Sequence, residues 1–385
     1  MAKTGRKLKI LHVTNSISMG GAEAHLLCLL GRLDRSAFEP VYAYLDDSAG
    51  WSDSLVSQFE DRGIPSVSLK TGSLLDLRAF GRLANLMKAG RFDIVHVHLL
   101  RSQLYGIPAA RWSGVPSVIV SVHNTSRRFA RFPTNSIAKI SFAMADRIIA
   151  ISRAVGEHLV RNGCVSNGKL RVIHYGYDVK QSSDPGTNDL RNQLRLPPGT
   201  KLLGVVARLM PPKGHRYLFD ALPEVLKANK EAHLLVIGGE DTAIAGALRA
   251  QVHDLHLDEK ITFLGYRADV AAILPQLDLF VLPSLSEGFG LVLLEAMAAG
   301  LPVVSTMVDA IPEIVEHGVT GLLVPPAQSR PLAEAINKIL GRPYRAREMG
   351  AAGRKRAEQC FSVAKMVSET EQLYREVARG KGLLS

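Results

Sequence analysis

The stretch from Ser286 to Val304 constrains the fold of this chain more than any other part of the sequence. An apolar run at Leu279–Leu282 precedes it and predicts a buried strand. A short turn with two glycines follows, and a run of good helix formers then leads to Gly300 and Pro302, which end a predicted helix. A strand, a tight turn and a helix in this order are typical of a parallel sheet. They direct the first backbone N–H groups of the helix towards a ligand above the strand.

Two carboxylates lie within this stretch. Glu287 is on the predicted turn, and Glu295 is one to two turns into the helix, which is predicted to begin near Gly290 or Leu291. Carboxylates repel a bare phosphate at a helix N-terminus, but they accept strong hydrogen bonds from sugar hydroxyls. A ligand with phosphate in its middle and hydroxyls at both ends meets both conditions, so the stretch predicts a site for a nucleotide diphospho-sugar.

Strand-like and helix-like segments alternate along the whole chain, which predicts an α/β fold with a doubly wound parallel sheet in each half. In the first half we predict strands at Leu8–Val13, Val41–Leu45, Ser66–Leu69, Asp93–His98, Ser117–Val122, Arg147–Ile151 and Leu170–Ile173, with helices at Ala22–Leu33, Leu74–Ala89 and Ile137–Ala145. In the second half we predict strands at Leu202–Ala207, Leu234–Ile237, Ile261–Phe263, Leu279–Leu282 and Pro302–Ser305, with helices at His215–Lys227 and Pro331–Leu340.

The length of 385 residues predicts two domains. A segment from about Tyr177 to Gly199 is rich in Ser, Asp, Asn, Gly and Pro, which is typical of a linker between domains. We therefore expect an N-terminal domain at residues 1–180 and a C-terminal domain at residues 181–362. The final predicted helix, Val363–Ala378, is amphipathic.

The net charge of +11 is confined to the first half of the chain. Residues 1–180 hold 24 Lys and Arg against 13 Asp and Glu, whereas residues 181–385 hold 23 of each kind. Such a surface is either simply solvated or meets an acidic partner, for which anionic lipid, a phosphorylated acceptor and nucleic acid are the options. Nucleic acid ranks last and is not expected as a partner, because the sequence contains no nucleic-acid-binding motif of known type.

The spacing of the cysteines and the hydropathy of the chain indicate the cellular compartment of the protein. The three cysteines, Cys28, Cys164 and Cys360, have no paired spacing, which disfavours a disulfide framework or a zinc site and favours a reducing compartment. We find no signal peptide and no segment that would span a bilayer. A cytoplasmic location is therefore expected, or a peripheral one on the inner face of the cytoplasmic membrane.

The spacing Glu287-x7-Glu295, the GFG at 288–290 and the EAMAAGLPV that continues it resemble the signature of retaining glycosyltransferases of family 4, which have the GT-B fold. The resemblance covers nearly the whole chain and is more specific over residues 200–340. It implies two Rossmann-like domains that face one another across a cleft. It also implies that the final helix, within residues 363–385, packs back on the N-terminal domain, which is the acceptor side.

The resemblance also implies the donor site. Arg208 and Lys213 follow a predicted strand end, where open parallel sheets bind ligands, and match the pair that holds the donor diphosphate in place of a metal ion. We therefore expect no catalytic metal and no cofactor. Glu287 would hold sugar hydroxyls and Glu295 the ribose. The other expected donor contacts are Gly20, Gly21, Gly238, Tyr266, Arg267, Gly288, Phe289, Gly290, Leu291 and Val292.

His123 ends the predicted strand Ser117–Val122 and matches a histidine that many family members place beside the transferring sugar. The expected catalytic set is therefore His123, Glu287, Arg208 and Lys213. The histidines at positions 12, 96 and 98 are expected to be structural.

Two further segments bear on ligand identity. Asp309 and Ala310 stand where family members commonly have a glycine pair, so the sequence does not define the donor sugar or its base. Cations alternate with aromatic rings in a loop that follows His123, and this loop is either a solvated surface or a patch for an acceptor or an anionic membrane. We call it the basic loop; its residues are Arg127, Arg128, Phe129 and Arg131.

The function that the resemblance implies is retaining transfer of a sugar from a UDP- or GDP-sugar to a hydroxyl of a lipid-linked or glycan acceptor, in the synthesis of cell-surface polysaccharide or glycolipid. A sugar-nucleotide epimerase, a phosphorylase-like enzyme and a non-catalytic sugar-nucleotide-binding protein remain alternatives. No feature of the sequence marks the pyridoxal lysine that a phosphorylase needs. A binding protein has little need of the complete diphosphate set.

Overall fold

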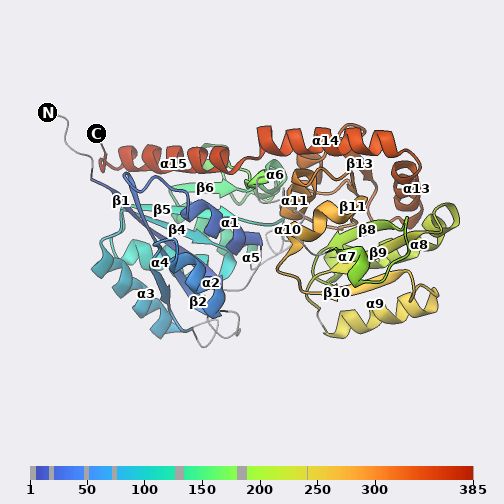
Figure 1. Ribbon diagram of the computed structural model, residues 1–385. Coiled ribbons are helices and arrows are strands. Elements are labelled where there is room, and N and C mark those ends of the chain that lie inside the picture. The colour runs from blue at the N-terminus through green and yellow to red at the C-terminus, as the bar shows by residue number, and fades with distance from the viewer. Residues whose placement is uncertain are drawn as a thin grey trace. The chain divides into compact units, whose positions relative to one another are not determined.

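A computed structural model of the chain describes residues 6–16, 21–46, 52–71, 76–125, 134–179, 189–240 and 242–384. The chain divides into two compact units, each built around one parallel sheet (Figure 1). The first unit comprises Met1–Gly176 together with Val363–Ser385, and the second comprises Tyr177–Ser362.

The first unit contains a seven-stranded sheet in the order β3-β2-β1-β4-β5-β6-β7. Its strands are β1 (Leu8–Ser16), β2 (Phe38–Asp46), β3 (Ser66–Ser68), β4 (Ile94–His98), β5 (Ser117–Val122), β6 (Arg147–Ala150) and β7 (Leu170–Val172). Neighbouring strands pair in parallel, and the order reverses between β1 and β4. The central strands β4 and β5 are buried along their whole length, which explains why they are rich in Val and Ile.

The helices of the first unit are α1 (Gly21–Leu30), α2 (Ser52–Glu60), α3 (Leu77–Gly90), α4 (Leu100–Trp112), α5 (Thr134–Met144), α6 (Arg153–Arg161) and α15 (Val363–Gly380). The last of these comes from the far end of the chain, yet its buried face is part of the core of this unit. Met366, Leu373 and Tyr374 pack there with Ile10 of β1 and Ile94 of β4.

The second unit contains a six-stranded sheet in the order β10-β9-β8-β11-β12-β13. Its strands are β8 (Lys201–Val206), β9 (Ala232–Ile237), β10 (Ile261–Gly265), β11 (Leu279–Leu282), β12 (Val303–Thr306) and β13 (Gly321–Val324). The helices are α7 (Leu190–Gln193), α8 (His215–Ala228), α9 (Thr242–Asp254), α10 (Val270–Ile273), α11 (Leu291–Ala298), α12 (Ile311–Ile314), α13 (Ser329–Leu340) and α14 (Pro343–Cys360). Here the order reverses between β8 and β11.

The predicted fold class, an α/β chain with two doubly wound parallel sheets, is confirmed. The predicted strands at Leu279–Leu282 and Ser117–Val122 have the bounds observed for β11 and β5. The predicted helix from Ala22 ends three residues earlier than expected, at Leu30.

Several helices were not expected, and two of them show why. Helix α4 contains Pro108, which normally ends a helix, and α14 contains Gly350 and Gly353 within a run rich in arginine. Tertiary packing outweighs the low propensity in α14, because Gly353 and Gly350 face the end of α11. The lack of a side chain at Gly350 is required there, since a Cβ atom would lie 1.9 Å from the carbonyl oxygen of Gly300.

We predict that Gly350→Ala destabilises the second unit, because the added methyl group forces α14 away from the end of α11 at a cost of ~1–3 kcal/mol. The matched control is Gly246→Ala, which changes an exposed helical glycine of α9 with nothing within 4 Å of the new Cβ atom. That change is expected to stabilise by ~0.5–1 kcal/mol. Scanning calorimetry of both variants measures the difference, and equal melting temperatures would contradict the close packing described here.

Candidate functional site

Two loops meet where the strand order of the second sheet reverses. One follows β8 and the other follows β11, and these strands are neighbours in the sheet. The backbone N–H of Leu285 donates to the carbonyl of Pro212 at 2.7 Å, which joins the two loops directly. In open parallel sheets this reversal leaves a crevice at the carboxyl ends of the strands, and that is where ligands bind.

The structure brings two of the predicted catalytic residues together in these loops. Lys213 Nζ donates to Glu287 Oε1 at 2.5 Å, and Ser284 Oγ donates to the same oxygen at 3.1 Å. Glu287 is only 8% exposed, and burying a carboxylate costs free energy unless it is paired and hydrogen-bonded in this way. A cation and a carboxylate are thus held side by side at the crevice.

Gly214 allows the two loops to approach so closely. Its φ of +70° is in the left-handed region, and a Cβ atom would lie 2.0 Å from the carbonyl oxygen of Pro283. Any other residue at this position would push the β8 loop away from the β11 loop. The distance between Lys213 and Glu287 therefore depends on this glycine.

Arg208 is exposed and follows β8 in the same loop. Gly238, at the end of β9, packs against the backbone beside it, since a Cβ atom there would lie 2.1 Å from the carbonyl oxygen of Ala207. Glu240, two residues further along, forms an ion pair of 2.6 Å with Arg249. The turn after β9 therefore supports the backbone from which the Arg208 side chain extends.

Asp309 departs from the family pattern, and the structure shows what its side chain does. Its Oδ2 atom accepts hydrogen bonds from Glu287 N at 2.9 Å and from Ser286 Oγ at 2.7 Å. Its backbone has a φ of +42°, a conformation that glycine adopts readily and aspartate tolerates. The carboxylate therefore holds the turn that carries Glu287, from 22 positions further along the chain.

Helix α11 begins at Leu291 and Val292, after Gly288, Phe289 and Gly290. Gly290 occupies the N-cap position with a φ of +96° and has no side chain to cap the first turn. The Phe289 ring is buried and packs on Phe361 with ring centroids 5.9 Å apart. The start of this helix is therefore fixed in place while its N-terminus carries no capping carboxylate.

Glu295 lies on the second turn of α11. Burial raises the pKa of its carboxyl group from 4.5 to about 7. The group is therefore partly protonated at neutral pH in the protein without ligand.

Tyr266 and Arg267 follow β10. The Tyr266 side chain is 45% exposed, and the Arg267 guanidinium is bound by both carboxylate oxygens of Asp269, at 2.7 and 2.5 Å. The Arg267 guanidinium is therefore already paired within the loop. A ligand at this loop would meet its backbone groups rather than the Arg267 side chain.

His123 lies in the first unit, directly after β5, at the carboxyl edge of that sheet. Its Nε2 atom is 3.2 Å from His98 Nδ1, and its Nδ1 atom is hydrogen-bonded to the Tyr175 hydroxyl. Burial lowers the pKa of His123 to about 3, so its ring is neutral at physiological pH. Both ring nitrogens are thus bound by the protein.

Some of the remaining predicted site residues lie outside the residues that the structure describes. Gly21 is the first residue of α1, and Gly20 lies outside the described residues. The whole basic loop, with Arg127, Arg128, Phe129 and Arg131, also lies outside them.

The contacts that hold the predicted site residues in place were not predicted from the sequence. Ser284 and Asp309 support Glu287, and Tyr175 and His98 bind His123. The alternation of VHVH in β4 was a usable signal, since it places two histidines on one face of the sheet.

We predict that the Glu295 carboxyl makes stability depend on pH. Because its pKa is raised, the folded protein binds more protons than the unfolded chain between about pH 4.5 and pH 7, and stability falls as pH rises through that window. Glu295→Gln removes this loss, which is ~3–4 kcal/mol above pH 7, because the pKa rises from 4.5 to about 7 and each pKa unit is worth about 1.4 kcal/mol. Unfolding measured from pH 4.5 to 8 should show the variant gaining on the native protein with pH. A constant difference would mean that the carboxyl is not buried.

Family models match both units. The model described as "Glycosyltransferase Family 4" matches residues 19–181, and the one described as "Glycosyl transferases group 1" matches residues 200–342.

Curated relatives match over most of their length. One is the UDP-Gal:alpha-D-GlcNAc-diphosphoundecaprenol alpha-1,3-galactosyltransferase of Escherichia coli, with 27% identity over 84% of this chain and 86% of the relative. Another is the N-acetyl-alpha-D-glucosaminyl L-malate synthase of Bacillus anthracis, with 26% identity over 79% of this chain and 80% of the relative.

Among solved structures, the Anabaena protein HepE in complex with UDP and glucose has a TM-score of 0.85. It shares 24% sequence identity and covers 96% of this chain and 100% of its own, which is a likeness of fold. Together with the two matched models and the signature around Glu287 and Glu295, these likenesses show that this chain is a glycosyltransferase of family 4 with the GT-B fold.

Proposed function

We propose that this glycosyltransferase moves a sugar, with retention of its anomeric configuration, from a UDP- or GDP-sugar to a hydroxyl group of a lipid-linked or glycan acceptor. The observation that supports the donor part of this proposal is the contact between the loop that follows β8 and the loop that follows β11. Arg208 and Lys213 follow one strand and Glu287 follows the next, with Lys213 and Glu287 in contact. Cations for a diphosphate and a carboxylate for sugar hydroxyls are thus placed on adjacent loops.

The charges of these loops suit departure of the diphosphate without a metal ion. Arg208 presents a planar, exposed guanidinium to phosphate oxygens, while the Lys213 charge is already balanced by Glu287. Cations and helix N–H groups fixed in advance stabilise the negative charge that grows on the leaving group. In the proposed front-face reaction, the leaving diphosphate helps to deprotonate the incoming hydroxyl, so no protein nucleophile is required.

The acceptor proposal rests on the charge of the first half and on the relatives. All the excess positive charge lies in residues 1–180. The E. coli relative is named for an acceptor that carries a diphosphoundecaprenol group, which is both anionic and lipid-linked. Among the residues that the structure describes, no helix has the length and apolar character needed to cross a bilayer. We therefore propose that the first unit reaches a lipid-linked acceptor by lying on an anionic membrane surface, in the synthesis of cell-surface polysaccharide or glycolipid.

Arg208→Ala is expected to weaken binding of UDP or GDP by about 10- to 100-fold, because it removes a charge-assisted contact worth ~1.5–3 kcal/mol. Titration calorimetry with each nucleotide measures the affinity and identifies the base. The matched control is Lys227→Ala, since Lys227 is an exposed cation near the opposite end of α8.

The same titrations, and release of nucleotide from a donor sugar, should be unaffected by excess chelator, since the cations replace a metal ion. Unchanged affinity in Arg208→Ala would refute the phosphate role. Loss of turnover with chelator that magnesium or manganese restores would refute metal independence. If the protein binds the nucleotide-sugar but never cleaves the nucleotide from the sugar, the result would favour a non-catalytic binding protein.

A variant with Arg127, Arg128 and Arg131 changed to Glu is expected to lose membrane binding. Each cation near an anionic surface contributes ~1 kcal/mol, so three of them shift partitioning by about a hundredfold. Sedimentation with anionic vesicles at low and high salt measures this, with neutral vesicles as the control. If native protein and variant pellet equally, or if neither pellets at low salt, the basic loop does not bind membranes.

A further inference from the structure

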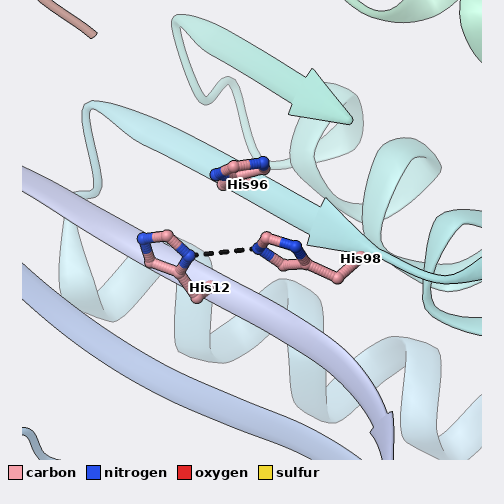
Figure 2. Close-up of side chains that lie close together, drawn as sticks. All are labelled: His12, His96 and His98. Atoms are coloured by element: carbon pink, nitrogen blue, oxygen red, sulfur yellow. Dashed lines mark hydrogen bonds between the residues drawn. The ribbon is translucent and has the colours of Figure 1, made fainter. Parts of the chain in front are cut away.

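Histidines gather on one face of the first sheet. His12 lies on β1, His96 and His98 lie on the neighbouring β4, and their rings lie close together beside these strands (Figure 2). The strand register pairs His12 with His96, and His98 with Ser121 of β5. All three rings are buried, and they lie where the strand order reverses. In an open parallel sheet, ligands bind outside the carboxyl ends of the strands at this reversal, and His98 is the last residue of β4.

Hydrogen bonds lead from this group to His123. His123 Nε2 is 3.2 Å from His98 Nδ1. His98 Nε2 is in turn 3.1 Å from His12 Nδ1, and Figure 2 shows this bond as a dashed line. At the other end of the series, the Tyr175 hydroxyl is bonded to His123 Nδ1.

The series continues from His12 into α15. His12 Nε2 is 3.4 Å from the Tyr374 hydroxyl, which is its longest link, and that hydroxyl is 2.8 Å from His96 Nδ1. His96 Nε2 is in turn 2.8 Å from Ser121 Oγ. We call the series from Ser121 through His96, Tyr374, His12, His98 and His123 to Tyr175 the histidine chain.

A metal ion is the obvious alternative occupant. Ring nitrogens of His12, His96 and His98 lie within 4.8 Å of one another, which suits three ligands of one ion. Each of these three rings, however, has both nitrogens within hydrogen-bonding distance of a protein partner. An ion would have to break several of these bonds, so the geometry favours a hydrogen-bonded chain.

The three rings that bond directly in series, His12, His98 and His123, permit only two arrangements of their protons. Burial lowers the pKa of His12 to about 3 and the pKa values of His96 and His98 well below their usual range, so each ring is neutral. A neutral imidazole has one donor and one acceptor nitrogen. Once one of these three rings is assigned, the other two must follow, because two donors or two acceptors would otherwise face each other. His96 is joined to them through the Tyr374 hydroxyl, which can accept from both rings and therefore holds His12 in place without dictating the tautomer of His96. The tautomer of His123 is therefore coupled to that of His12, although the two rings are connected only through His98.

Building on the proposed function, we propose that His12, His96, His98 and Tyr374 are positioning residues that fix the tautomer and ring orientation of His123 beside the transferring sugar. A ring that is held at both nitrogens presents a fixed dipole and does not reorient as charge develops. Glycosyl transfer then takes place against a neutral group whose position is set from inside the sheet.

The test compares His12→Leu with His12→Asn. Leucine removes the bond to His98, whereas the Asn amide places a donor or acceptor near the position of Nδ1 and restores it. NMR of protein with 15N-labelled histidine reports the tautomer of each ring. We expect His123 to show one tautomer in the native protein and a mixture in His12→Leu. The Asn amide can present its oxygen or its NH2, so His12→Asn should restore the bond to His98 and the ring orientation without restoring a single tautomer. We also expect kcat for the donor to fall at least about tenfold in His12→Leu with little change in KM, since misplacement of a site group costs rate.

The matched control is Tyr42→Phe, which removes a buried hydroxyl from the same core that bonds Thr14 at 2.8 Å and is not in the chain. It should leave the His123 spectrum and kcat unchanged. A single unchanged His123 tautomer in folded His12→Leu would overturn the proposal. The proposal would also be overturned if the native protein bound one equivalent of a metal ion and the His12→Asn variant did not. The NMR result needs no turnover, so it stands apart from the proposed function. A coupled tautomer with no transfer would refute the function alone.

Discussion

The structure depends on one constraint of parallel sheets. All strands of a sheet end at the same edge, and where the strand order reverses, the connecting helices diverge to opposite faces and leave that edge open. This happens between β1 and β4 in the first unit and between β8 and β11 in the second. Each reversal carries a group of polar residues, one centred on His12 and His98 and one on Lys213 and Glu287.

The two groups of polar residues offset the free-energy cost of their burial in opposite ways. In the second unit charges are kept, because Lys213 faces Glu287 and Asp309 receives the N–H of the Glu287 turn. In the first unit charge is excluded, because burial keeps the histidines neutral and each ring satisfies the next.

Residues that follow strand ends were predictable from sequence, and their supports were not. The positions of Arg208, Lys213, Glu287 and Glu295 follow from local patterns of strand, turn and helix. Asp309 reaches Glu287 from 22 positions away and Tyr374 reaches His96 from 278 positions away, and no local period encodes such contacts. The pKa of Glu295 likewise depends on tertiary burial, which the helical pattern around it does not show.

Helix α15 gives the first unit an unusual history during synthesis. Its buried face completes the core of β1, β2 and β4, but it is translated only after the whole second unit. The second unit is continuous in sequence and can close its own core as it leaves the ribosome. Until α15 arrives, the first unit lacks Met366, Leu373 and Tyr374 and exposes the apolar face that they cover. The half that is made first is therefore finished last, and the newly made chain holds a formed second unit beside an incomplete first one.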